Sequence, residues 1–116
     1  MVKATHSAQQ TSAAPLADEL RAHSELMLEL ARRYVWWLTP AEAMDYPARV
    51  AAQVMNIGVF QDATRLAEAV GDDCLRAVVR SAEAGQFNAR SWHYWHYRLG
   101  LAKPGHVPPL PVRHLP

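Results

Sequence analysis

Residues 47–58 read Pro-Ala-Arg-Val-Ala-Ala-Gln-Val-Met-Asn-Ile-Gly, a stretch that predicts one short helix with both of its ends marked. Proline is favoured in the first turn of a helix, where its missing N–H leaves no hydrogen bond unmade. Val50, Val54 and Ile57 recur at a period near 3.6 residues, so they form one apolar stripe. Gly58 suits the position just past the helix end, where glycine adopts the left-handed conformation with little strain.

The same pattern, an apolar stripe followed by a glycine, recurs three times after residue 58. It predicts helices over residues 61–70, 73–84 and 89–99, which end at Gly71, Gly85 and Gly100. We expect Asp72 and Asn88 to cap the last two helices. The predicted stripes are Ala63, Leu66 and Val70, then Leu75, Val78, Val79 and Ala82, and finally Trp92, Trp95 and Leu99. These segments do not resemble one another in sequence, so they are not a true repeat.

Two further helices are expected before residue 47. The first begins near Pro15, and Glu29 and Arg33 form a helix-supporting pair on it. Its stripe is Leu16, Leu20, His23, Met27, Leu30 and Tyr34. A capping box, Thr39-Pro40-Ala41-Glu42, begins a second and short helix, which Pro47 interrupts.

Together these segments predict an all-α fold, a compact array of about six short helices. No strand-like alternation of apolar and polar residues occurs anywhere in the sequence. We expect residues 1–14 to form a flexible leader and residues 15–101 the helical domain. Residues 102–116 hold five of the eight prolines and form an extended or disordered tail. We also expect residues 1–14 and 104–116 to be dispensable for folding.

The charge balance argues against a dedicated nucleic-acid binder. The net charge is +1, with five basic and six acidic groups in residues 1–58 and seven basic and five acidic groups in residues 59–116. Nucleic-acid binders usually concentrate basic charge in one place. There is no apolar run long enough to span a membrane and no secretory signal. The single cysteine, Cys74, suits a reducing compartment, so we expect a cytoplasmic protein.

Catalytic and metal-binding motifs are weak. His93 and His96 have the spacing of metal ligands on a helix, but no second ligand pair accompanies them. Asp72 and Asp73 are explained by a helix start, and no phosphate-binding glycine loop or nucleophile elbow occurs. Cys74 follows two acids, which oppose thiolate formation. We therefore expect no enzyme activity, no cofactor, no metal and no small-molecule ligand.

The segment Ser91-Trp92-His93-Tyr94-Trp95-His96-Tyr97-Arg98 carries more aromatic surface than one small core can hide. We expect Trp92 and Trp95 to be core residues. Tyr, Trp and Arg are enriched at the energetic centres of protein interfaces. The predicted partner-binding residues are therefore the rest of this helix surface together with one residue of the apolar patch at 34–38: Tyr94, Tyr97, Arg98, His93 and Trp36.

A helix-turn-helix regulator of transcription is the main alternative for a small all-α chain. Arg76, Arg80 and Arg90 would then meet DNA phosphates. A recognition helix usually presents polar side chains to the bases, whereas the last predicted helix presents aromatic ones. A third alternative is a structural subunit without catalytic activity.

Residues 34–101 resemble a family of small bacterial proteins whose genes often precede the gene of an AbiEii-type nucleotidyltransferase toxin. The resemblance rests on four groups of residues: Trp37-Leu38-Thr39-Pro40-Ala41-Glu42-Ala43, the stretch from Pro47 to Gly58, the residues Asp62, Leu66 and Gly71, and Ser91-Trp92 followed by Trp95-His96-Tyr97-Arg98-Leu99-Gly100-Leu101. The string from Trp95 to Leu101 is the most specific of these.

The resemblance implies an antitoxin-like protein of a toxin–antitoxin or phage-defence pair. Its partner would be the nucleotidyltransferase toxin, which it would hold inactive. We expect the mechanism to be occlusion, in which the aromatic helix face covers either the active-site cleft of the toxin or a tRNA-binding surface. The resemblance implies no catalytic residue.

Overall fold

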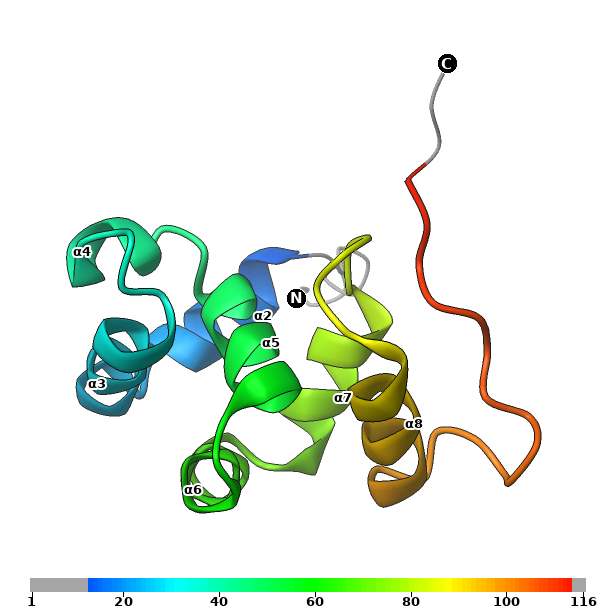
Figure 1. Ribbon diagram of the computed structural model, residues 1–116. Helices are drawn as coiled ribbons and strands as arrows, with labels where there is room; N and C mark the ends of the chain where they lie inside the picture. Colours follow the sequence, from blue (N-terminus) through cyan, green and yellow to red (C-terminus); the bar gives the residue numbers. More distant parts are fainter. Residues whose placement is uncertain (1–12, 114–116) are drawn as a thin grey trace, which may run out of the picture.

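Helix α5 (Pro47–Ile57) runs through the middle of the molecule and contacts every other helix of the described chain (Figure 1). The computed structural model describes residues 13–113, which form seven helices and no strand. The all-α prediction is therefore confirmed. The other helices are α2 (Ala13–Arg21), α3 (Ser24–Tyr34), α4 (Pro40–Ala43), α6 (Phe60–Val70), α7 (Asp72–Arg80) and α8 (Ala89–Arg98).

The composition of α5 explains its central place. Ala51 and Ala52 are buried beside Val50, Val54 and Met55, so most of the helix circumference is covered by neighbours. Small alanine side chains let other helices approach closely, and valine and methionine fill the remaining space. Figure 1 places α3 and α4 on one side of this helix and α7 and α8 on the other, with α6 crossing below.

The predicted first helix is two helices, α2 and α3, which meet at Ala22 and His23. No proline or glycine marks this break, so the continuous stripe concealed it. Leu20 and Met27 on either side of it are both fully buried. Helix α2 packs on α5 and α7, whereas α3 packs on α4 and α5. The bend lets the two halves of one stripe cover different neighbours.

Glycine ends α5 for a different reason than the one predicted. Gly58 has φ −66°, which is not left-handed. A Cβ atom there would lie 2.4 Å from the carbonyl oxygen of Val54, so the close approach of the backbone excludes larger residues. Gly71 does have a positive φ of 87°, and it joins α6 directly to α7.

Two predicted boundaries of the 73–84 helix are wrong. Gly71, and not Asp72, occupies the N-cap position of α7, and Asp72 is the first helical residue. The helix ends at Arg80 and not at residue 84. The Ser81 hydroxyl donates to the Ala77 carbonyl at 2.8 Å, and the Glu83 backbone N–H donates to the Gln86 side chain at 3.0 Å. These local bonds favour a turn over another helical turn.

A buried carboxylate joins α3 to α6. Asp62 is 2 % exposed and accepts hydrogen bonds from the Tyr34 hydroxyl at 2.6 Å and from Arg33 at 2.7 Å. Arg65 pairs with Glu29 at 2.8 Å. The predicted pair within α3, Glu29 with Arg33, is therefore wrong, because both side chains reach across to α6.

The tail has the extended conformation that the prolines predict, but it also packs on the helices. Residues 101–113 contain no helix. Val107 and Leu110 are partly buried against the core, and the Trp92 indole N–H donates to the Pro108 carbonyl at 2.8 Å. These contacts argue against treating residues 104–113 as dispensable. Of the predicted leader, residues 1–14, the part from residue 1 to residue 12 lies outside the described residues.

The buried Asp62 carboxylate makes the stability of the protein decrease at low pH. The Tyr34 hydroxyl and the Arg33 guanidinium, which donate to its carboxylate, hold the pKa of Asp62 below its ordinary value. A lowered pKa in the folded state stabilises the protein above the unfolded pKa of about 4, and this contribution is lost as the pH falls through the folded value.

We therefore expect Asp62→Asn to lower the free energy of unfolding at pH 7. The difference in free energy of unfolding between wild type and variant should become smaller as the pH falls below about 4. Urea unfolding at a series of pH values measures this difference, and a difference that stays constant would contradict a lowered pKa of Asp62.

Candidate functional site

Helix α8 begins at a cap that also fixes it to α5. The Asn88 side chain accepts from the Ser91 backbone N–H at 2.8 Å, so the predicted N-cap is confirmed. The Asn88 backbone N–H donates to the Asn56 side chain at 3.0 Å, and the Ser91 hydroxyl donates to the Asn56 carbonyl at 2.7 Å. The start of α8 is thereby attached to the end of α5.

The inner side of α8 is part of the core. Trp95 is 2 % exposed, and its indole N–H donates to the Met55 carbonyl at 2.8 Å. Trp92 and Leu99 are buried as well, so all three predicted core residues are confirmed. The Arg76 guanidinium donates to the Leu99 carbonyl at 2.8 Å and holds the other end of the helix. A helix anchored at both ends presents its outer side chains at defined positions.

The outer side of α8 carries four of the five residues predicted to bind a partner. Tyr94 and Tyr97 are 46 % and 45 % exposed, and His93 and Arg98 are also exposed. The Arg98 guanidinium lies 5.0 Å from the centre of the Trp95 ring and donates to the Tyr94 hydroxyl at 3.4 Å. The rings of His93 and Tyr97 meet edge to face at 6.2 Å. These contacts restrain the exposed side chains of the helix.

This outer surface is basic and aromatic. Helix α8 has no acidic residue, and Arg90 lies one turn before Tyr94 on the same side as Arg98. Among residues 13–113, the Arg90 side chain has no ion pair with an acidic residue, and it is exposed. We call the set Arg90, His93, Tyr94, Tyr97 and Arg98 the α8 face.

A hollow of about 500 Å³ continues the α8 face toward the start of α6. Tyr94 and Arg90 line one side of it, and Ile57 and Phe60 line the other. Ile57 is 55 % exposed and Phe60 is 73 % exposed. The sequence pattern predicted Ile57 as part of the core stripe of α5, which is wrong, because the chain leaves α5 there and no neighbouring helix covers the Ile57 side chain. Phe60 follows Gly58 and Val59 and lies outside the apolar stripe predicted for the next helix, so the sequence pattern did not indicate its position.

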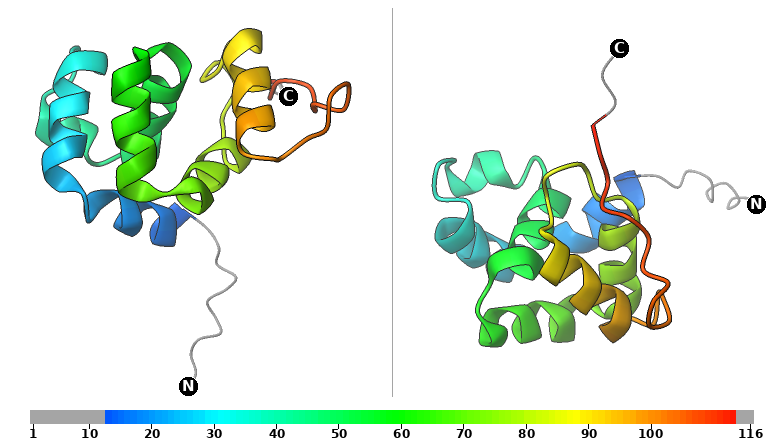
Figure 2. Two further views of the ribbon diagram at one scale, coloured as in Figure 1. Left: turned by 90° about the horizontal axis from the view of Figure 1, so that it is seen from below. Right: turned by 45° about the vertical axis from the view of Figure 1, so that its right-hand side comes forward.

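Trp36 does not join the α8 face. It is 75 % exposed in the connection between α3 and α4, where it packs edge to face on Trp37 at 5.6 Å. Figures 1 and 2 place α3 and α4 across α5 from α8. The five predicted partner-binding residues therefore occupy two separate surfaces.

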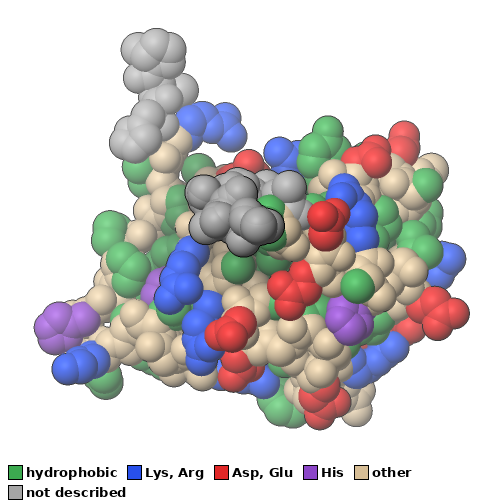
Figure 3. Space-filling view, turned by 180° about the vertical axis from the view of Figure 1, so that it is seen from behind, with side chains coloured by type: hydrophobic (Ala, Val, Ile, Leu, Met, Phe, Trp, Pro, Cys, Tyr) green, Lys and Arg blue, Asp and Glu red, His purple; other side chains and the backbone are tan. Residues whose placement is uncertain are grey.

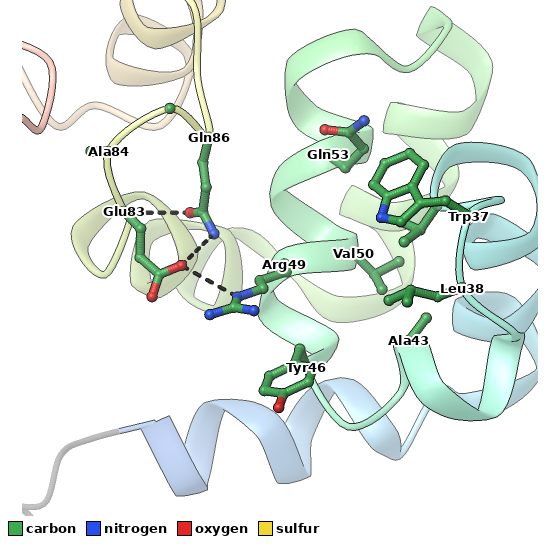
Figure 4. A pocket seen from close by; sticks show the side chains of 12 residues that line it. Trp37, Leu38, Ala43, Tyr46, Arg49, Val50, Gln53, Glu83, Ala84 and Gln86 are labelled. Carbon is green, nitrogen blue, oxygen red and sulfur yellow. Dashed lines mark hydrogen bonds and ion pairs between the residues drawn. The ribbon is translucent and has the colours of Figure 1, made fainter. Parts of the chain in front are cut away.

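A second hollow, of about 470 Å³, lies beside α5, between the connection from α3 to α4 and the loop of residues 83–86 (Figure 4). Val50 and Ala43 form an apolar floor, and Trp37 and Tyr46 stand at its edge. Arg49 closes one side through an ion pair with Glu83 at 3.3 Å. Gln53 and Gln86 also line it, so the hollow combines an apolar floor with polar side chains at its rim.

The titratable groups weighed as chemical sites are held in structural roles. His93 and His96 each direct Nδ1 to a backbone carbonyl one turn back, at 2.8 Å. His93 is exposed whereas His96 is buried, so the two rings do not face one space. Burial raises the pKa of the Cys74 thiol to about 11, which keeps it protonated at neutral pH. Within residues 13–113, no three potential metal ligands gather.

Figure 3 shows the molecule from behind relative to Figure 1, with Lys and Arg side chains interspersed with Asp and Glu. None of the helices between residues 13 and 113 has the length and apolar character needed to cross a membrane.

Comparisons of the chain with protein-family models, with curated proteins and with solved structures found no match.

The two sides of α8 predict opposite mutational effects on folding. Trp95→Ala removes a buried ring and its hydrogen bond, so we expect the free energy of unfolding to fall by about 3–5 kcal/mol. The triple variant Tyr94→Ala, Tyr97→Ala and Arg98→Ala changes exposed side chains, each of which contributes about 0.5 kcal/mol or less. Urea unfolding of both proteins makes the comparison. Equal losses of stability would show that the outer residues belong to the core.

Proposed function

We propose that this chain is a non-catalytic binding protein that recognises a protein partner through the α8 face. The observation that carries the proposal is a basic, aromatic helix surface that is exposed while the same helix is anchored by two buried tryptophans. Such surfaces lose little side-chain entropy on binding, because their rings are already restrained. Tyr and Arg are also the residues that most often supply the binding energy of interfaces.

The resemblance noted in the sequence gives the proposed partner, a nucleotidyltransferase toxin. Enzymes that transfer phosphoryl groups hold their metal ions with carboxylates, which leaves the active-site cleft acidic. The α8 face has no acidic residue and two exposed arginines, so its charge complements such a cleft. The tRNA-binding surface of a toxin would be basic and would repel the same arginines. We therefore propose an antitoxin that covers the catalytic cleft.

The charge distribution favours this role over DNA binding. Arg76, one of the three arginines that a helix-turn-helix regulator would direct at phosphates, is bound to Asp73 at 2.6 Å and to the Leu99 carbonyl. A side chain with two partners inside the molecule contributes little to counterion release on DNA.

We expect a nucleotidyltransferase gene to lie next to the gene of this chain. The test is co-expression of the two proteins, scored by cell growth and by co-purification. We expect the triple variant Tyr94→Ala, Tyr97→Ala and Arg98→Ala to lose neutralisation and to bind at least ~30-fold more weakly, which corresponds to about 2 kcal/mol. The matched control, Glu25→Ala with Arg32→Ala, changes exposed residues of α3 and should still protect the cells.

A Trp36→Ala variant, tested in parallel, shows whether the exposed connection between α3 and α4 also contributes to toxin binding. A triple variant that binds and protects like wild type would place the interface elsewhere. Tight, salt-dependent binding of the wild type to its own promoter, without co-purification of the toxin, would favour the regulator instead.

A further inference from the structure

The hollow of about 500 Å³ beside the α8 face, which we call the Phe60 hollow, lies where exposed apolar side chains gather. Nine large apolar side chains of the described residues are exposed, and five of them lie on α8 or between the end of α5 and the start of α6. These five are Ile57, Val59, Phe60, Tyr94 and Tyr97. Exposed apolar groups gathered in one region mark a surface that contacts another molecule.

The polar groups that line the Phe60 hollow already have partners within the fold. The Asn56 side chain accepts from the Asn88 backbone N–H at 3.0 Å, and the Ser91 hydroxyl donates to the Asn56 carbonyl at 2.7 Å. The Asn88 side chain accepts from the Ser91 backbone N–H, and the Trp95 indole N–H donates to the Met55 carbonyl. These bonds hold the hollow in shape, so the uncharged polar groups contribute little to the choice of a ligand.

Arg90 gives the hollow its charge. Of the described residues that line it, Arg90 alone is charged. Its side chain is exposed and has no ion pair with an acidic residue among residues 13–113. The hollow at Trp37 differs, because its arginine, Arg49, is paired with Glu83 at 3.3 Å. An uncompensated positive charge beside apolar walls complements an apolar group that has a negative charge next to it.

The backbone that carries Phe60 is fixed, although the Phe60 side chain is exposed. The Val59 backbone N–H donates to the Tyr34 hydroxyl at 3.0 Å, and the same hydroxyl donates to the buried Asp62 carboxylate at 2.6 Å. The opposite wall belongs to α8, whose start is bonded to the end of α5. A site whose walls are fixed in advance loses little conformational entropy when a ligand enters it.

We propose that the Phe60 hollow takes a large apolar side chain of the protein partner, and that Arg90 binds a carboxylate next to that side chain. This inference rests on the proposed function, because it specifies what the α8 face recognises on the toxin. A side chain that fills a pocket near the centre of an interface supplies much of the binding energy, and a charged pair at the rim selects the partner. The contact on the toxin is therefore an acidic segment with one large apolar residue.

The test is a double-mutant cycle in the full-length chain, measured as the affinity for the purified toxin by titration calorimetry. The variants are Phe60→Ala, Arg90→Gln and the two changes together. The matched controls are Tyr46→Ala, an exposed aromatic residue at the opposite end of α5, and Arg32→Gln, an exposed arginine of α3. Urea unfolding of each protein shows whether the fold is intact.

We expect each of the two single changes in the hollow to weaken toxin binding at least ~10-fold. The double variant should lose less than the product of the two single effects, because one segment of the toxin contacts both groups. The controls should bind within ~2-fold of wild type. Arg90→Gln should also make the affinity less sensitive to salt.

The outcomes separate this inference from the proposed function. A wild type that does not bind the toxin would contradict both. If the α8 triple variant loses binding whereas Phe60→Ala or Arg90→Gln binds like wild type, the proposed function stands and the inference is overturned. Independent effects of the two changes would also overturn it. A wild type that sediments as a dimer, and as a monomer after Phe60→Ala, would show that a second copy fills the hollow, which again overturns the inference.

Discussion

The last turn of α5 is the constraint on which the candidate site depends. The final carbonyl groups of a helix have no partner within it and must be satisfied from outside. The Trp95 indole N–H donates a hydrogen bond to the Met55 carbonyl, and the Ser91 hydroxyl donates one to the Asn56 carbonyl. Helix α8 is therefore the C-terminal cap of α5 as well as a packed neighbour. The same bonds that complete the central helix fix the direction in which Tyr94 and Tyr97 point.

If the proposed function holds, this arrangement separates stability from recognition within one helix of ten residues. The buried side of α8 uses large rings with a polar tip, which fill the core and bond to backbone carbonyls at the same time. The exposed side carries a basic and aromatic surface, parts of which pack on the outer edge of Trp95. Asp62 has an equivalent structural role on the other side of α5, where it binds α3 to α6 through Tyr34 and Arg33.

The sequence pattern predicted the helices and most of the core, because burial leaves a regular apolar period wherever a helix has one covered side. The capping box at Thr39 and the N-cap at Asn88 were also predictable, since each requires a particular side chain at a particular position. The break at His23 was not, because tertiary packing, and not a local breaker, bends the chain there. The role of Gly58 comes from a contact with the Val54 carbonyl that no single-sequence pattern reveals. The exposure of Phe60 and Ile57, and the docking of the tail on Trp92, likewise depend on what lies nearby in three dimensions.

Photo-crosslinking in cells that produce both proteins is the most direct test of the central claim, that the α8 face contacts a nucleotidyltransferase toxin. A photoreactive phenylalanine analogue would replace Tyr94 in one strain and Glu25, an exposed residue of α3, in another. We expect a covalent adduct between the chain and the toxin from position 94 and none from position 25. An adduct from position 25 alone, or the absence of any adduct with the toxin from position 94, would contradict it.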